Sequence, residues 1–437
     1  MRKIYVLIAT ILTAIFMLSS VNFVFATSAD RELTNDEKAA FIVRDEWTAW
    51  VKSFTASLSE LDKNATAKIY DDMDFYDMQY RFTEKYKKVP EYLDEDGKPT
   101  QKLKDMIKEK RKEISGAKNY GFLCFTAKAN GVSIRLSNAS LGTIGRSSDG
   151  VSFTSWDGSA VSLNSGDKLY VWNKSDTLSN STTQAQFSIT GGNVEASGDA
   201  ASMINFGEAK QDCFRRLFYN QTNLTTLPEV TLTNTADRCY QEMFYGCSNA
   251  KTGPSSLPAE NIASNAYNGM FRNCSQLETV PSISAKSVGE SGCYDMFSNC
   301  AAFKTVPNLP ATTLSEDCYS QMFIDCSGLT DASSITLPAL TVPSGAYSVM
   351  FAGCYNLVKS PMIKATTMAS GSLREMFGGC ASLNEIHIEN FEGELGDPTP
   401  GWVQSGVPEG GTIYYPGPTT NQSDSEIPIG WTKVSSN

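Results

Sequence analysis

The chain has 437 residues and a formal net charge of −11, and 41% of its residues are hydrophobic. This acidic balance excludes a basic surface large enough to bind nucleic acid in bulk. The one histidine, His387, lies in the alternating stretch "NEIHIENF", which predicts a strand with the imidazole facing solvent. Catalysis that needs a histidine beside a serine or cysteine nucleophile is therefore not expected.

Residues 1–26 predict a secretory signal peptide. Arg2 and Lys3 precede a long apolar run that ends in Val24-Phe25-Ala26, and cleavage is expected after Ala26. The run is also long enough to serve as an uncleaved anchor. We therefore expect a secreted or cell-surface protein that meets a membrane only through this segment, if the segment is retained.

Residues 30–118 predict a helical region rich in charge. Apolar residues recur there at steps of three and four, which places them on one helix face: Trp47, Trp50, Val51, Phe54, Leu58 and Leu61. Two further helices are expected at about 65–88 and 100–114. The acidic stretches "YDDMDFYDM" and "YLDEDGK" lack the ligand spacing of a calcium-binding EF-hand loop, so no metal site is predicted.

Residues 119–200 predict a small β-sandwich domain. Short runs such as "FLCFTAKA", "VSIRLSN" and "KLYVWN" are rich in β-branched and aromatic residues, and turn-forming stretches such as "WDGS" separate them. Trp156 and Trp172 are candidates for a sugar-stacking platform, although tryptophans in such strands more often belong to the core.

From Cys213 onward the chain is periodic. Seven phenylalanines follow one another at intervals of 26 to 28 residues: Phe218, Phe244, Phe271, Phe297, Phe323, Phe351 and Phe377. A leucine or methionine precedes each of them, and in six units a cysteine follows three residues later. This period predicts a solenoid of about seven units over residues 205–391, with residues 392–437 as a C-terminal cap or tail.

Each unit is expected to contain a short helical turn ("CYxxMFxxC"), a short strand ("LxxVP") and a loop, which makes the expected fold class α+β. A unit of this size cannot cover its own apolar face, so neighbouring units must stack strand to strand.

The repeat cysteines are interpreted as packing residues. One column contains Cys213, Cys239, Ala266, Cys293, Cys318, Ala346 and Ser372. A position that accepts alanine and serine requires a small side chain, and buried cysteine behaves as a small hydrophobe. Free thiols are therefore favoured, with disulfides between neighbouring rungs as the alternative in an exported chain.

The phrases "EDCYSQMFIDCSGL" and "VPNLPATTLSEDCY" resemble the BspA-like leucine-rich repeats of exported bacterial surface proteins. The resemblance covers Cys213 to about Phe391. It implies a leucine-rich-repeat solenoid with a short strand and a short helix per repeat. It also implies a binding or adhesive protein without catalytic residues, and it names no ligand.

The strand residues that flank the inward positions form the expected open face. One column contains Thr226, Thr252, Thr279, Thr305, Asp331, Lys359 and Glu385. Beside it, Lys251, Glu278 and Lys304 alternate in charge on successive rungs, and such neighbours attract weakly. Threonine ladders and alternating charges also stabilise sheets without any ligand, so this face is a candidate docking surface and no more.

Two functions stay open on the sequence. The first is protein–protein interaction or adhesion through the solenoid face, with a host or bacterial surface protein as partner. The alternative is carbohydrate binding through the β-sandwich, with a glycan as ligand. No enzyme activity, cofactor or metal is expected, because no pair of carboxylates is marked out by its spacing.

Overall fold

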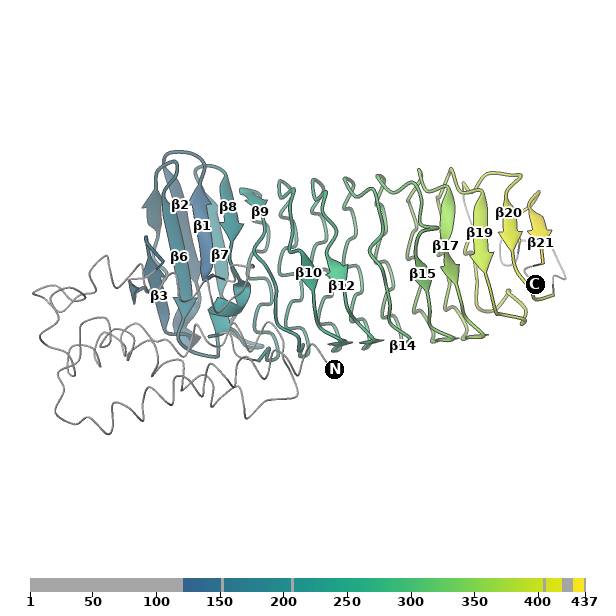
Figure 1. The fold of residues 1–437 in the computed structure, drawn as a ribbon, viewed down its shortest axis with the longest axis horizontal. Coiled ribbons are helices and arrows are strands. Elements are labelled where there is room, and N and C mark those ends of the chain that lie inside the picture. The colour runs from purple at the N-terminus through teal and green to yellow at the C-terminus, as the bar shows by residue number, and fades with distance from the viewer. Residues whose placement is uncertain (1–120, 151–152, 206–207, 404–405, 419–426, 436–437) are drawn as a thin grey trace, which may run out of the picture. The chain divides into compact units, whose positions relative to one another are not determined.

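The computed structural model describes residues 121–150, 153–205, 208–403, 406–418 and 427–435. The predicted signal peptide and helical region lie outside these described residues. Gly121–Gly150 and Thr154–Asn437 form one compact unit. Within it, a β-sheet cap leads into a β-solenoid of about eight turns, which follow one another regularly along the solenoid axis (Figure 1).

The expected α+β fold class is wrong. Among the described residues the structure has no α-helix and two short 3₁₀ turns, Ala139–Leu141 and Ala200–Ile204. The helical turn that the sequence predicted in each repeat is a different structure, built from consecutive β-turns.

The cap consists of two antiparallel sheets. β4, β3, β6, β1 and β8 lie side by side in one sheet, and β5, β2 and β7 form the other. Their bounds are β1 Leu123–Ala127, β2 Val132–Ser137, β3 Ile144–Ser147, β4 Thr154–Ser155, β5 Val161–Leu163, β6 Lys168–Asn173, β7 Gln186–Thr190 and β8 Val194–Ser197.

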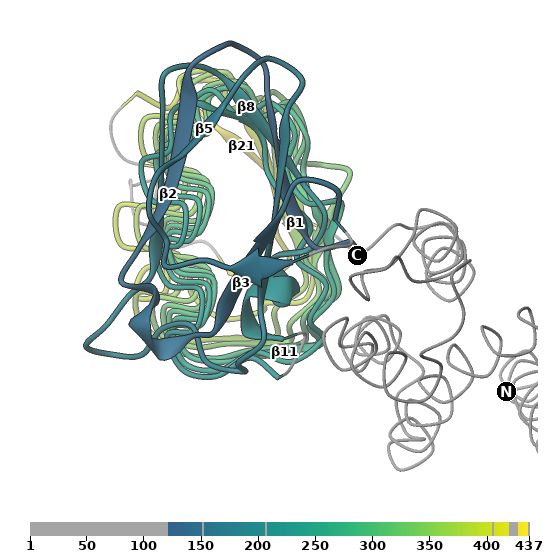
Figure 2. The same ribbon diagram turned by 90° about the vertical axis from the view of Figure 1, so that its left-hand side faces the viewer.

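The cap and the solenoid share hydrogen bonds on both sides. β8 pairs in parallel with β9, the first strand of the repeats. On the opposite side, the Phe187 N–H of β7 donates to the Leu217 carbonyl at 2.9 Å. The view along the axis shows β1 and β8 on the same side as β21, and β2 on the side of the coiled turns (Figure 2). The sheets predicted at 119–200 are thus joined to the repeats without a break.

Each turn of the solenoid, called a rung here, has three walls. The ladder wall carries β9 Leu224–Thr226, β10 Ser256–Leu257, β12 Ser282–Ile283, β15 Thr336–Leu337, β17 Lys359–Ile363, β19 Glu385–Ile388, β20 Thr412–Tyr414 and β21 Thr432–Val434. The short wall carries β11 Asn261–Ile262, β13 Ser287–Val288, β14 Thr313–Leu314, β16 Thr341–Val342 and β18 Thr367–Met368. Strands of neighbouring rungs pair in parallel.

The third wall, called the turn wall, contains the repeated "MF" segments. Its N–H groups donate alternately to the next rung and to their own rung. The Phe218 N–H donates to Met243 of the next rung at 2.9 Å, whereas the Tyr219 N–H donates to Arg216 at 3.1 Å. In an α-helix every N–H would instead bond within its own segment. Apolar residues at period four fit both structures, which explains the wrong prediction.

Left-handed residues at every fourth position of the turn wall distinguish it from a helix. One such column lies two residues after the repeat phenylalanines, and in six of its seven rungs a cysteine follows it; φ is between 56° and 75° at Asn220, Gly246, Asn273, Asn299, Asp325, Gly353 and Gly379. Glycine, asparagine and aspartate are the residues that adopt this conformation most easily. The sequence therefore carried a signal against the helix, in the residue two positions after each repeat phenylalanine, which precedes the cysteine where one follows.

The interior of the solenoid is a stack of rings. Phe244, Phe271 and Phe297 are fully buried, with ring centroids 5.4 and 5.3 Å apart in successive rungs. The stack runs from Phe187 in the cap to Phe377, and Trp402 lies beyond it at 6.1 Å. The predicted period is thus confirmed, and successive rungs share one buried apolar interior.

The structure describes every cysteine as a buried free thiol. Six of them form a ladder in which each thiol donates to the carbonyl of the phenylalanine one rung earlier, at 3.1 to 3.2 Å; they are Cys247, Cys274, Cys300, Cys326, Cys354 and Cys380. Burial raises the pKa of the Cys247 thiol to about 12, and the pKa of each other ladder thiol also rises with burial. The thiols are thus neutral hydrogen-bond donors inside the core.

Candidate interaction surfaces

The predicted open-face column lies along the ladder wall. Consecutive members pair in parallel where bridges form, as Thr226 does with Thr252 and Asp331 with Lys359. Thr226, Lys359 and Glu385 are half-buried. The other members are exposed, and they are Thr252, Thr279, Thr305 and Asp331.

One of these threonines joins the first rung to the cap, and another joins two neighbouring rungs. The Thr226 hydroxyl donates to the Ala196 carbonyl at 2.7 Å, and Thr279 Oγ1 accepts from the Gly253 N–H at 2.8 Å. The threonine part of the column therefore has a clear structural role.

Lys251, Glu278 and Lys304 are exposed beside this column. The Glu278 N–H donates to the Lys251 carbonyl at 3.0 Å, so these two residues do lie on neighbouring rungs. Among the described residues, however, no ion pair joins the three side chains. The charges alternate on successive rungs, but these described side chains form no ion pairs with one another.

The C-terminal rungs bring charged and aromatic residues together on the ladder wall. Lys359 Nζ lies 3.0 Å from Glu385 Oε2, and His387 Nε2 lies 2.7 Å from Glu385 Oε1. The His387 ring stacks on Tyr414 with centroids 4.3 Å apart. Asp331, Lys359, Glu385, His387 and Tyr414 together form the ladder-wall cluster.

Contacts within this cluster fix the charges that it presents. The hydrogen bond from His387, followed by that from Lys359, lowers the pKa of the Glu385 carboxyl. The hydrogen bond with Glu385 in turn raises the pKa of Lys359. Glu385 therefore stays ionised and Lys359 protonated at neutral pH. His387 lies on a strand as predicted, but its side chain is half-buried instead of facing solvent, with 22% of its surface exposed.

Trp156 and Trp172 are buried in the cap, with 5% and 2% of their surfaces exposed. The Trp156 Nε1–H donates to the Ser159 carbonyl at 2.9 Å, and the Trp172 Nε1–H donates to Asn205 Oδ1 at 3.1 Å. Both rings therefore serve the core, and neither supplies a sugar-stacking platform.

A pocket lies beside Trp156 on the surface of the cap. It encloses about 450 Å³ between β2 and residues 157–160, and its polar lining comes from Arg135, Ser137, Asn138, Asp157 and Ser159. Hydrogen bonds from Ser159 lower the pKa of Asp157, so this carboxylate is ionised at neutral pH.

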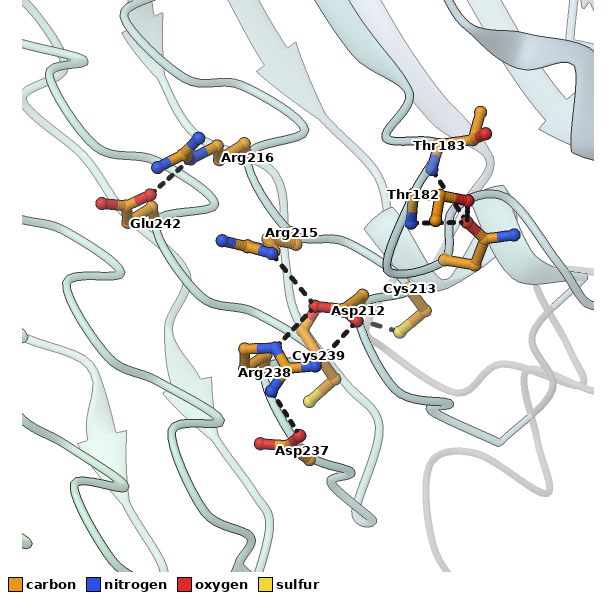
Figure 3. A network of polar contacts seen from close by, with 11 residues as sticks. Thr182, Thr183, Asp212, Cys213, Arg215, Arg216, Asp237, Arg238, Cys239 and Glu242 are labelled. Carbon is orange, nitrogen blue, oxygen red and sulfur yellow. Dashed lines mark hydrogen bonds and ion pairs between the residues drawn. The ribbon is translucent and has the colours of Figure 1, made fainter.

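Sequence reasoning missed a network of arginines on the turn wall. Asp212 is fully buried, and Arg215 and Arg238 both point to its carboxylate (Figure 3). Arg238 Nε donates to Oδ1 at 2.9 Å and its Nη2 to Oδ2 at 3.2 Å. Nearby, Arg216 Nε lies 2.5 Å from Glu242 Oε2. These pairs join the first rung to the second.

Two tyrosines extend this network into a surface stack. The Tyr219 and Tyr245 rings are 4.7 Å apart and nearly parallel, with Arg216 over the first ring at 5.2 Å and Arg272 over the second at 5.8 Å. Each tyrosine follows a repeat phenylalanine, so aligning the "FY" pairs as stacked rungs would have predicted the contact. Because Asp212 is fully buried, and because Asp212 and Glu242 each pair with an arginine of the neighbouring rung, this network is better explained as a clamp between rungs.

Among the described residues, no helix is long and apolar enough to cross a membrane. No family model matches the chain, and comparison with curated proteins gave no match. A crystal structure of a T. pallidum leucine-rich-repeat protein is similar at 19% identity and a TM-score of 0.28, over 44% of this chain and 83% of that chain. At a TM-score this low, the similarity supports no conclusion about the binding partner of this chain.

Proposed function

We propose that this chain is an exported, non-catalytic protein of the BspA-like leucine-rich-repeat type that binds a protein partner on its ladder wall. The repeat phrases support the family assignment, and the N-terminal apolar run supports export to the cell surface or medium. The regular solenoid supports an interaction role, because such folds present extended rigid faces.

The ladder-wall cluster is the observation that carries the proposal. Its residues come from adjacent, hydrogen-bonded strands, so their relative positions are fixed before a partner arrives. Preorganised side chains lose little entropy on binding. Tyrosine is one of the residues enriched in binding hot spots, so Tyr414 is the expected anchor of the cluster. The charged residues beside it would set orientation and specificity for a partner of complementary charge.

The cluster can be tested by a matched pair of charge reversals. Lys359→Glu places a second acid beside Glu385, whereas Lys286→Glu makes the same change on the short wall, where 70% of the lysine side chain is exposed. The chain with residues 1–26 removed would be used to capture host and bacterial surface proteins, followed by affinity measurement on the captured partner.

We expect Lys359→Glu and Tyr414→Ala to weaken binding at least tenfold and Lys286→Glu to leave it unchanged. Equal affinity for all three variants would refute the assignment to the ladder wall. Circular dichroism and melting curves would confirm that each variant is folded.

Glycan binding remains the second candidate because of the polar pocket on the cap. A glycan array probed with the intact chain would decide it, with Arg135→Ala and Asp157→Ala as variants. Signals that persist in both variants would remove the pocket from consideration.

A further inference from the structure

One interior column of the solenoid is aromatic in most rungs. Backbone bonds align its members: the Tyr240 N–H donates to Ala266, the Tyr267 N–H to Gly292, the Cys293 N–H to Cys318 and the Tyr319 N–H to Ala346. In each case the acceptor directly precedes the next member of the column. The column therefore contains Phe214, Tyr240, Tyr267, Cys293, Tyr319, Tyr347 and Leu373.

This alignment corrects the expected position of Cys293. The sequence placed it in the small-residue column with Cys239 and Cys318. In the structure Gly292 occupies that column, and Cys293 stands where the neighbouring rungs have tyrosine. The sequence already shows this shift in the fourth rung, which contains Phe297. Three residues separate Cys293 from Phe297, whereas four separate the corresponding cysteine and phenylalanine in the second and fifth rungs.

A thiol thus replaces a phenol between two tyrosines. Tyr240 and Tyr267 have rings 5.5 Å apart, and Tyr319 and Tyr347 have rings 6.2 Å apart. The side chain between Tyr267 and Tyr319 is far smaller than the phenol it replaces. Phe303, a larger residue than the leucine of neighbouring rungs, packs on Phe297 at 5.1 Å and brings no hydrogen-bonding atom.

The phenol hydroxyls beside this position are buried without a partner. The hydroxyl groups of Tyr240, Tyr267 and Tyr319 have no hydrogen bond to any described residue, although all three residues are at most 1% exposed. Tyr267 and Tyr319 are the two that flank Cys293, where the smaller side chain leaves room beside them. The backbone register places Cys293 between these two tyrosines. Burial raises the pKa of both phenols, and the Cys293 thiol contributes to the rise, after Cys239 in the case of Tyr267. Buried hydroxyls in folded proteins are almost always satisfied, and ordered water is the usual partner where protein atoms are not.

We propose that the fourth rung encloses ordered water that hydrogen-bonds the hydroxyls of Tyr267 and Tyr319 beside Cys293. Two hydroxyls and a thiol supply the several polar contacts that a buried water needs. The lining side chains are inaccessible to solvent, so the occupant is a molecule small enough to be trapped as the rungs close. This inference is independent of the proposed function.

Oxygen-17 magnetic relaxation dispersion on the purified chain tests the proposal directly, because it counts waters with long residence times. The wild-type chain should show internal water that is lost in Cys293→Phe, whose ring fills the column. An equal count in both proteins would overturn the proposal.

A second measurement covers the case in which Cys293→Phe does not fold. Removing a hydroxyl that water satisfies costs stability, whereas removing an unsatisfied buried hydroxyl increases it. Tyr267→Phe should therefore lower Tm by about 2–4 °C. Tyr347→Phe, two rungs away from Cys293, is the control for phenol removal in the same column. An unchanged or higher Tm for Tyr267→Phe relative to wild type would overturn the proposal.

Discussion

Truncation of Phe297 measures how strongly the rungs are coupled. The residue is fully buried, and its ring stacks on Phe271 at 5.3 Å and on Phe323 at 5.6 Å. Phenylalanine-to-alanine changes in cores cost about 3–5 kcal/mol, and each ring pair adds roughly 0.5–1.5 kcal/mol beyond its buried area. Because two stacks are lost, we expect Phe297→Ala to cost about 5 kcal/mol.

Phe297→Leu separates the contribution of buried apolar volume from that of ring stacking. Leucine keeps most of the apolar volume and loses both ring stacks, so a cost of about 1–2 kcal/mol is expected. Tyr355→Ala is the surface control, since Tyr355 is 52% exposed and should change stability by less than about 0.5 kcal/mol.

Urea denaturation with hydrogen exchange read by mass spectrometry is the appropriate assay. The Phe297 N–H donates to Met322, and the Phe271 N–H donates to Met296, so amides of adjoining rungs should lose protection first. A cost below about 1 kcal/mol for Phe297→Ala would refute the continuous core, and so would a loss of protection spread evenly over the solenoid.

Three further predictions concern a buried carboxyl group, a strained backbone angle and the thiols. Burial raises the pKa of Asp199 to about 7, so its contribution to stability is greatest below pH 4 and falls by up to roughly 4 kcal/mol as the pH rises to 7. In Asp199→Asn the free energy of unfolding should depend less on pH over this range, and a pH profile identical to that of the wild type would contradict the shift. Val349 has φ 57°, which is strained for a β-branched residue, whereas the corresponding residue of the third rung is Gly269. Val349→Gly should therefore raise stability by about 1 kcal/mol in thermal melts, and a lower Tm would show that the angle is not strained. Alkylation should modify none of the eleven cysteines in the native chain and all of them after denaturation without reductant, as counted by mass spectrometry; thiols still blocked after denaturation would indicate disulfides.

The period of the repeats could be predicted because the interior imposes it. Phenylalanine, methionine and cysteine recur at fixed intervals where each rung meets the next, and the structure stacks them as expected. The backbone of the turn wall was predicted wrongly because apolar spacing alone does not distinguish a helix from consecutive turns. The residues at positive φ do distinguish the two structures, and examples are Asn273 and Gly353, each directly before a cysteine.

The surface was harder to predict than the core. Lys359 and Glu385 were expected in one column, and they pair. The stack of His387 on Tyr414 was not foreseen, because Tyr414 lies beyond the recognisable repeats and joins them only through β20. Burial of Trp156 and Trp172 likewise depends on how the cap sheets face each other, which strand patterns do not specify.

The hydrogen bonds between rungs run along the solenoid axis, and this direction determines how the molecule would respond to force. Tension applied at the two ends of the solenoid pulls these bonds apart in line, so the load falls on one rung at a time. A rung of 26 residues, once released, adds roughly 90 Å of extended chain. A protein tethered at one end and bound at the other would thus lengthen stepwise under load before its anchored rungs separate.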